Sequence, residues 1–125
     1  MLTAVCIGSN DLKSAQEYYD TVLATIGMTR QVTETVEIGY GEINGLTNFW
    51  VLTPYNRKAA TAGNGAQTTF GARDSESVDA FYKAALLAGG TDEGPPGPRD
   101  YAPGYYGAYC RDPEGNKLHV CFIPD

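Results

Sequence analysis

Histidine is scarce in this sequence, because His119 is the only one among 125 residues. It lies in the stretch DPEGNKLHV, Asp112 to Val120, where a tight turn leads into a predicted strand. A strand often directs one metal ligand into a cavity, but a lone imidazole rarely holds a metal by itself. A metal site would therefore need partners from other parts of the chain.

Basic residues are in the minority. Nine lysines and arginines stand against fifteen acidic residues, and the formal net charge is −6. This charge disfavours nucleic acid and anionic membranes as partners and favours neutral or cationic small molecules. No apolar run approaches ~18 residues, and the N-terminus MLTAVCIGSNDL has no basic segment ahead of an apolar one. We therefore expect a soluble, unexported, cytoplasmic protein.

A disulfide framework is absent as well. The three cysteines, Cys6, Cys110 and Cys121, are an odd number, lie in apolar runs and show no C-x-x-C spacing. We expect buried, reduced thiols rather than metal ligands or a redox pair. A chain of 125 residues with 42% hydrophobic content is long enough for one domain, residues 1–125. Its core needs no disulfide bonds for stability.

What the sequence does contain is an internal repeat. A shift of 63 positions superposes these pairs: Gly8 on Gly71, Asp11 on Asp74, Ser14 on Ser77, Tyr18 on Phe81, Tyr19 on Tyr82, Leu23 on Leu86 and Gly27 on Gly90. Seven matches in one register indicate two copies of one structural plan. We assign the first half to residues 1–55 and the second to 64–125, joined by the small, polar segment Tyr55–Ala66.

Each half is predicted to run strand, helix, strand, strand, strand. Apolar residues at spacings of three and four predict the helices, with Asp11 and Asp74 as N-caps and glycines after their ends. The predicted strands are Thr3–Gly8, Thr29–Thr35, Val36–Glu42 and Asn48–Pro54, then Thr68–Ala72, a short strand near Thr91, Tyr105–Arg111 and Lys117–Pro124. The expected fold is α+β: two tandem βαβββ modules that form a cupped mixed sheet with the helices outside.

The halves differ most at GPPGPRDYAPG, Gly94 to Gly104. Proline cannot donate a backbone hydrogen bond, so this insertion is predicted to be irregular and to cover the rim of a cleft. Arg99 within it is a candidate anchor for an anionic group.

The duplicated βαβββ plan, with GSNDLKSAQEYYDTVL, the run SVDAFYKAALLAGGTDEGPPGPR and the closing YYGAYCRDPEGNKLHV, resembles the vicinal oxygen chelate superfamily over nearly the whole chain. That superfamily includes glyoxalase I, bleomycin-resistance proteins and extradiol dioxygenases. The resemblance implies a cavity walled by strands, with four side chains from the first and last strands of each half placed to hold a divalent metal.

Carried over to this sequence, those four positions fall at Ala4, Phe49, Gln67 and His119. Phe49 is placed there by a shift of 70, which aligns NFWVLTP with LHVCFIP. Only His119 is a good donor, and zinc or iron needs three or more. We therefore expect no cofactor, and a divalent metal is possible but disfavoured. A cluster of His119 with Cys6 and Cys121 remains an alternative, as does a cavity-lining imidazole bonded to a polar neighbour.

Strand alternation predicts which side chains face the cavity. They are Ala4, Cys6, Phe49, Val51, Gln67, Thr69, His119 and Cys121. Tyrosines crowd the insertion and the strand after it, so an aromatic lining is expected. The predicted ligand-binding residues are Phe49, Gln67, Thr69, Arg99, Tyr105, Tyr106 and His119.

These residues favour a binding protein for a small, partly aromatic molecule held between the half-sheets. We expect the chain to form a homodimer. The alternative is an enzyme: a metal-dependent lyase of glyoxalase type, or a dioxygenase, with a reduced metal site. In that case His119 is the candidate catalytic residue, including for acid–base chemistry.

Overall fold

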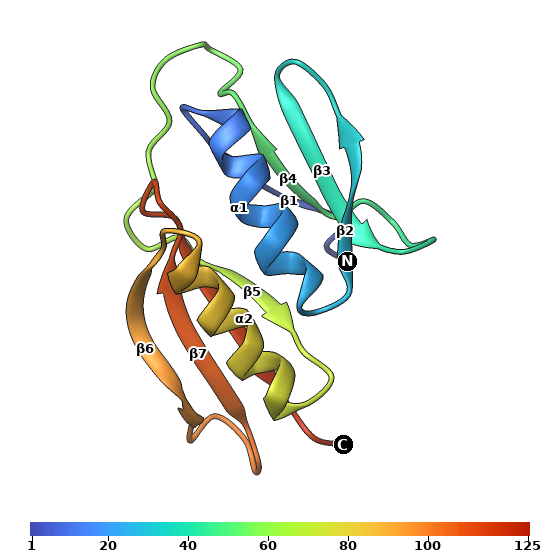
Figure 1. The fold of residues 1–125 in the computed structure, drawn as a ribbon, viewed down its shortest axis with the longest axis vertical. Coiled ribbons are helices and arrows are strands. Elements are labelled where there is room, and N and C mark those ends of the chain that lie inside the picture. The colour runs from blue at the N-terminus through green and yellow to red at the C-terminus, as the bar shows by residue number, and fades with distance from the viewer.

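The computed structural model describes all 125 residues and contains two modules of identical element order (Figure 1). The first consists of β1 (Val5–Gly8), α1 (Leu12–Ala24), β2 (Met28–Thr33), β3 (Glu37–Glu42) and β4 (Phe49–Leu52). The second consists of β5 (Thr68–Gly71), α2 (Ser75–Leu87), β6 (Thr91–Pro98), β7 (Tyr106–Arg111) and β8 (Lys117–Phe122). The predicted α+β fold of two βαβββ modules is confirmed.

Each module carries a four-stranded mixed sheet. The strand orders are β1-β4-β3-β2 and β5-β8-β7-β6, so the last strand of each module pairs with the first one in parallel. The other neighbours are antiparallel. As a result, β1 and β5 each have a single strand neighbour and form one edge of their sheets.

The two helices begin at the predicted N-caps. The Asp11 side chain accepts from the backbone N–H of Ser14 at 3.1 Å, and Asp74 accepts from Ser77 at 2.8 Å. Both helices lie on the same side of the molecule and pack against each other (Figure 1). Neither is long and apolar enough to cross a membrane.

The proline-rich segment departs from its prediction, because β6 continues through Gly94 to Pro98. This strand lies at the outer edge of its sheet, and prolines are tolerated in edge strands because only one side must form ladder hydrogen bonds. Its pairing with β7 shifts register twice, which accommodates the prolines. The Arg99 guanidinium donates to the carbonyls of Pro95, Gly97 and Pro98 and so holds the end of the strand.

One hydrophobic core of 18 buried residues extends across both modules. Its centre is a series of aromatic contacts: Tyr19 to Phe49 at 5.2 Å between ring centroids, Phe49 to Phe70 at 5.1 Å, and Phe70 to Phe81 at 5.7 Å. Phe49 belongs to β4 and Phe70 to β5, so this series joins the two halves. Burial of apolar area at this junction favours a single folding unit.

A polar network fastens one end of the junction. The predicted turn after β7 begins at Asp112, which is 5% exposed and accepts from the Tyr19 hydroxyl of α1 at 2.6 Å. The backbone N–H groups of Glu114 and Asn116 also donate to Asp112, each at 2.9 Å. Glu114 in turn accepts from the Ser9 hydroxyl, just after β1. We call these contacts the Asp112 clasp.

Candidate functional site

The strand register corrects the predicted equivalence of the two closing strands. Val5 pairs with Phe49, and Thr68, which is 63 residues after Val5, pairs with Leu118. Phe49 therefore corresponds to Leu118, and the first-half counterpart of His119 is Trp50. The shift between these strands is 69 and not 70, so the placement of Phe49 at a ligand position is wrong.

A slip of one residue moves a strand side chain to the opposite face. Phe49 is 2% exposed and packs under α1 against Tyr19, and Val51 is likewise in the core at 1%. The prediction that both side chains share a sheet face with Cys6 is therefore wrong, because they lie on the opposite, buried face. Trp50 instead shares its sheet face with Cys6, its neighbour in β1.

The opposite face of the first sheet carries no helix. Cys6 is exposed there, contrary to the expectation that all three cysteines are buried, whereas Cys110 and Cys121 are buried as predicted. The Trp50 ring lies over Gly39 of β3, where an added Cβ would come within 2.9 Å of it. A glycine in β3 thus makes room for the indole.

The residues at the corrected ligand positions do not fit a divalent metal. They are Ala4, Trp50, Gln67 and His119, which together offer one amide and one imidazole. The Gln67 amide donates to the Thr69 hydroxyl at 3.1 Å. No three or more His, Cys, Asp or Glu side chains are grouped to hold a metal, so His119, Cys6 and Cys121 do not form the alternative cluster.

His119 is the centre of an aromatic group that we call the tyrosine–histidine cluster, made of Tyr101, Tyr105, Tyr109 and His119. The imidazole is 2% exposed, and its Nδ1 lies 2.8 Å from the carbonyl of Ala108. Because a carbonyl can only accept, Nδ1 carries the proton, and Nε2 accepts from the Tyr105 hydroxyl at 2.7 Å. Both ring nitrogens are thereby occupied.

Stacking completes this cluster. The His119 ring lies 4.0 Å from the Tyr109 ring at an interplanar angle of 14°, and Tyr101 and Tyr109 share a hydroxyl contact at 2.8 Å. Gly107 leaves the space that the imidazole fills, since a Cβ there would lie 2.7 Å from a ring carbon of His119. The cluster satisfies its own polar atoms.

The electrostatic surroundings keep the cluster neutral. Burial lowers the pKa of His119, and the nearby cations of Arg99 and Lys117 lower it further, against the hydrogen bond to Ala108. Burial and the contact with Cys121 raise the pKa of Tyr105 well above its ordinary value. Burial and the hydrogen bond between the Tyr109 and Tyr101 hydroxyls raise the pKa of Tyr109 to about 12. The two cations lie 5.6 and 5.2 Å from the Tyr109 ring centroid.

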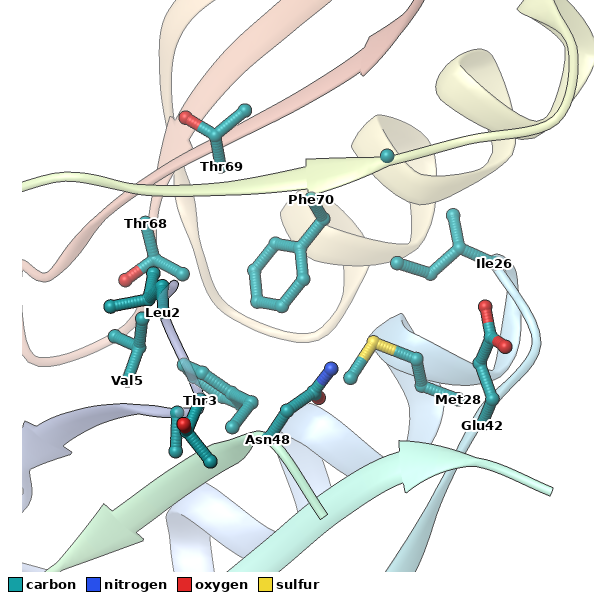
Figure 2. A pocket seen from close by; sticks show the side chains of 13 residues that line it. Leu2, Thr3, Val5, Ile26, Met28, Glu42, Asn48, Thr68, Thr69 and Phe70 are labelled. Atoms are coloured by element: carbon teal, nitrogen blue, oxygen red, sulfur yellow. The ribbon is translucent and has the colours of Figure 1, made fainter. Parts of the chain in front are cut away.

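A separate pocket of about 350 Å³ lies at the junction of the two modules (Figure 2). We call it the inter-module pocket. Its lining residues come from both halves: Leu2, Thr3, Ala4, Val5, Ile26, Met28, Glu42, Asn48, Phe49, Thr68, Thr69, Phe70 and Gly71. The Phe70 ring and the Met28 sulfur point toward its interior in Figure 2. Seven of the 13 lining residues are hydrophobic, and the others are threonine, asparagine, glutamate and glycine. Apolar walls that include polar groups are typical of a small-molecule site.

The structure divides the predicted binding residues among three places. Phe49 and Thr69 line the inter-module pocket, and His119 lies in the tyrosine–histidine cluster. Arg99, Tyr105 and Tyr106 line a second hollow of about 630 Å³ formed by residues 98–106, and Tyr105 also belongs to the cluster through its hydrogen bond to His119. Gln67 is exposed next to Thr69. The predicted set therefore does not converge on one point.

Sequence reasoning missed Ile26, Met28 and Phe70 as lining residues. The repeat did contain a signal, because it places β1 and β5 as equivalent first strands. Residues of both strands line the pocket, and Ile26 and Met28, which follow α1, complete its wall.

The fold and its paired modules match many solved structures. A glyoxalase/bleomycin resistance protein from Albidiferax ferrireducens T118 is 38% identical, with a TM-score of 0.89 and 99% of each chain covered. A glyoxalase-related enzyme from Fulvimarina pelagi is 20% identical, with a TM-score of 0.77, over 99% of this chain and 88% of that one. Lactoylglutathione lyase from Agrobacterium tumefaciens is 18% identical, with a TM-score of 0.68, over 98% and 92%.

Scans against protein-family models and curated proteins gave no match. The two structures at or below 20% identity show the fold that glyoxalases, bleomycin-resistance proteins and dioxygenases share, the vicinal oxygen chelate fold. The match at 38% identity over the full length shows family membership in addition to the fold. The chain belongs to the glyoxalase/bleomycin resistance protein family.

Proposed function

We propose that this protein binds a small, partly aromatic molecule in the inter-module pocket without the help of a metal. The observation that carries the proposal is the pocket itself, which both modules line at their junction. Its volume of about 350 Å³ lies at the lower end of ligand sites and suits a molecule of one ring system with a short substituent.

The chemistry of the walls supports an aromatic ligand. Phe49 and Phe70 meet nearly edge to face, at 78°, and Phe70 is 7% exposed at the pocket. Met28 adds a polarisable sulfur, and such sulfurs make favourable contacts with rings. Thr3, Thr68 and Asn48 supply polar groups that can orient a bound molecule.

The donor set argues against the metal-dependent alternative. Relatives with this fold include a lactoylglutathione lyase, but the positions where the resemblance implies metal ligands here hold Ala4, Trp50, Gln67 and His119. The imidazole has no free nitrogen, because Ala108 and Tyr105 occupy both. Shared fold alone does not carry an activity from one protein to another.

Chemical-shift mapping with indole and 2-phenylethanol tests the proposal. We expect the backbone signals of residues 2–5 and 68–71 to shift together and to saturate. Thr3→Phe, which fills the pocket from its exposed wall, should abolish the shifts, whereas Thr35→Phe, an equally exposed threonine outside the pocket, should preserve them. Shifts confined to α1 and α2, or unchanged in Thr3→Phe, would contradict it.

A further inference from the structure

The inter-module pocket contains one ionisable side chain. Among its lining residues only Glu42 carries a charge; the others are apolar, hydroxyl, amide or glycine residues. In Figure 2 the Glu42 carboxylate lies at the end of the pocket near Ile26 and Met28, and Leu2 and Thr68 lie at the opposite end. The pocket is therefore polarised along its length.

Glu42 has no cationic partner. The ion pairs in the structure join Arg30 to Asp20, Arg73 to Asp74 and Arg111 to Glu93. Arg73 shares a neighbouring surface hollow with Glu42, but its side chain is 87% exposed and its guanidinium lies 3.7 Å from Asp74. The Glu42 side chain is exposed, and an unpaired carboxylate at the end of a pocket attracts a positive group on a bound ligand.

The backbone of Glu42 is held firmly in place. Its carbonyl accepts from the Gln31 side chain at 2.6 Å and from the Gly45 N–H at 2.8 Å, at the start of the turn between β3 and β4. No hydrogen bond uses the carboxylate. Replacing it with an amide of the same shape would therefore remove the charge and leave these backbone contacts intact.

From this arrangement we infer that the ligand of the inter-module pocket is a small arylalkylamine, bound as the ammonium ion. Its ring lies against Phe70 and Met28, and its ammonium group lies toward Glu42. The inference rests on the proposed function and adds the charge of the ligand to it. The overall charge of −6 reinforces the preference, since it raises the local concentration of cations.

A comparison of three probes of similar size tests the inference: 2-phenylethylamine as the cation, 2-phenylethanol as the neutral molecule and phenylacetate as the anion. Their dissociation constants are measured by NMR titration at low ionic strength. We expect the amine to bind about threefold to fivefold tighter than the alcohol, the range of a solvent-exposed ion pair, and phenylacetate to bind most weakly. The preference for the amine over the alcohol should shrink in 0.5 M salt, because the electrostatic screening length then falls below about 5 Å.

Two matched variants assign the effect to the pocket. Glu42→Gln should equalise the affinities for the amine and the alcohol, and Glu34→Gln, which removes the same charge from an exposed site outside the pocket, should preserve the difference. Equal binding of amine and alcohol by the unmodified protein, or an advantage that survives in Glu42→Gln, would overturn the inference and leave the proposed function standing. Failure of all three probes to shift the pocket residues would overturn the proposed function itself, and the inference with it.

Discussion

The Tyr105 hydroxyl donates to Nε2 of His119, the only histidine of the chain, across 2.7 Å. The opposite nitrogen donates to the carbonyl of Ala108. An imidazole bound on both sides in a buried position fixes the strands β7 and β8 beside it. From these contacts we propose a structural role for His119 within the tyrosine–histidine cluster.

Tyr105→Phe should destabilise the protein, because it leaves Nε2 of a buried imidazole without a donor. We expect a loss of about 1–3 kcal/mol in the free energy of unfolding, measured by urea titration. Tyr101→Phe is the control, since its hydroxyl bonds only to Tyr109 and its side chain is 65% exposed. Equal losses in the two variants would show that Tyr105 does not satisfy His119.

The lowered pKa of His119 predicts a pH dependence of stability. Its folded-state pKa lies below the ordinary value of 6.5, so below pH 6.5 the unfolded chain binds a proton that the folded chain does not. Stability contributed by the neutral imidazole is complete above that pH and is lost as the pH falls toward the folded-state pKa. Urea midpoints at pH 7.5 and 5.5 should differ more in the parent than in His119→Gln, and an equal decline in both would contradict this assignment.

Phe49→Ala should be strongly destabilising, because Phe49 lies at the centre of the aromatic series that joins the modules. The expected loss is about 3–5 kcal/mol, the usual range for a buried phenylalanine. Trp50→Ala, one position along the same strand but only half-buried on the opposite face, should cost less. A larger loss for Trp50 than for Phe49 would reverse the assigned faces of β4.

We expect the purified protein to retain no stoichiometric divalent metal after dialysis. One amide and one fully bonded imidazole do not offset the dehydration of such an ion. Elemental analysis measures this directly. One equivalent of zinc, iron, nickel or manganese per chain would revive the enzymatic alternative.

We propose that two chains associate into a homodimer through sheet faces that no helix covers. Cys6 is exposed on such a face, next to Trp50. The outer edge β6 is an unsuitable contact, because its prolines oppose pairing with another strand. Sedimentation at tens of micromolar should give a species of twice the chain mass of 13.4 kDa, and a monomer alone would exclude the dimer.

The sequence was sufficient for the order of elements, because the repeat and the N-caps Asp11 and Asp74 depend on local chemistry. The sequence was insufficient to predict which face of the first sheet carries the Phe49 side chain. A shift of 70 aligns Pro54 with Pro124, but both prolines lie beyond the ends of β4 and β8 and do not fix the pairing inside them. The sheet face that a side chain of β4 or β8 occupies depends on how these strands pair with β1 and β5. No local sequence pattern encodes that register.

Two further errors have the same origin. Prolines within β6 are compatible with a strand only because that strand is outermost, and its position in the sheet is a property of the whole module. Cys6 lies in an apolar run that predicts burial, yet it points to the uncovered face of its sheet. The inter-module pocket could not be predicted either, since its walls come from segments more than sixty residues apart.

The Asp112 clasp has no counterpart related by the internal repeat. Tyr82 is the repeat partner of Tyr19, but its hydroxyl donates to Asp92 inside its own module and reaches no residue of the other half. Side-chain hydrogen bonds thus join the two modules at the Asp112 end of their junction. None joins them at the Glu42 end, where the pocket lies. The relative placement of the two modules therefore rests on hydrogen bonds at the Asp112 end and on apolar packing, including the contact of Phe49 with Phe70, beside the pocket.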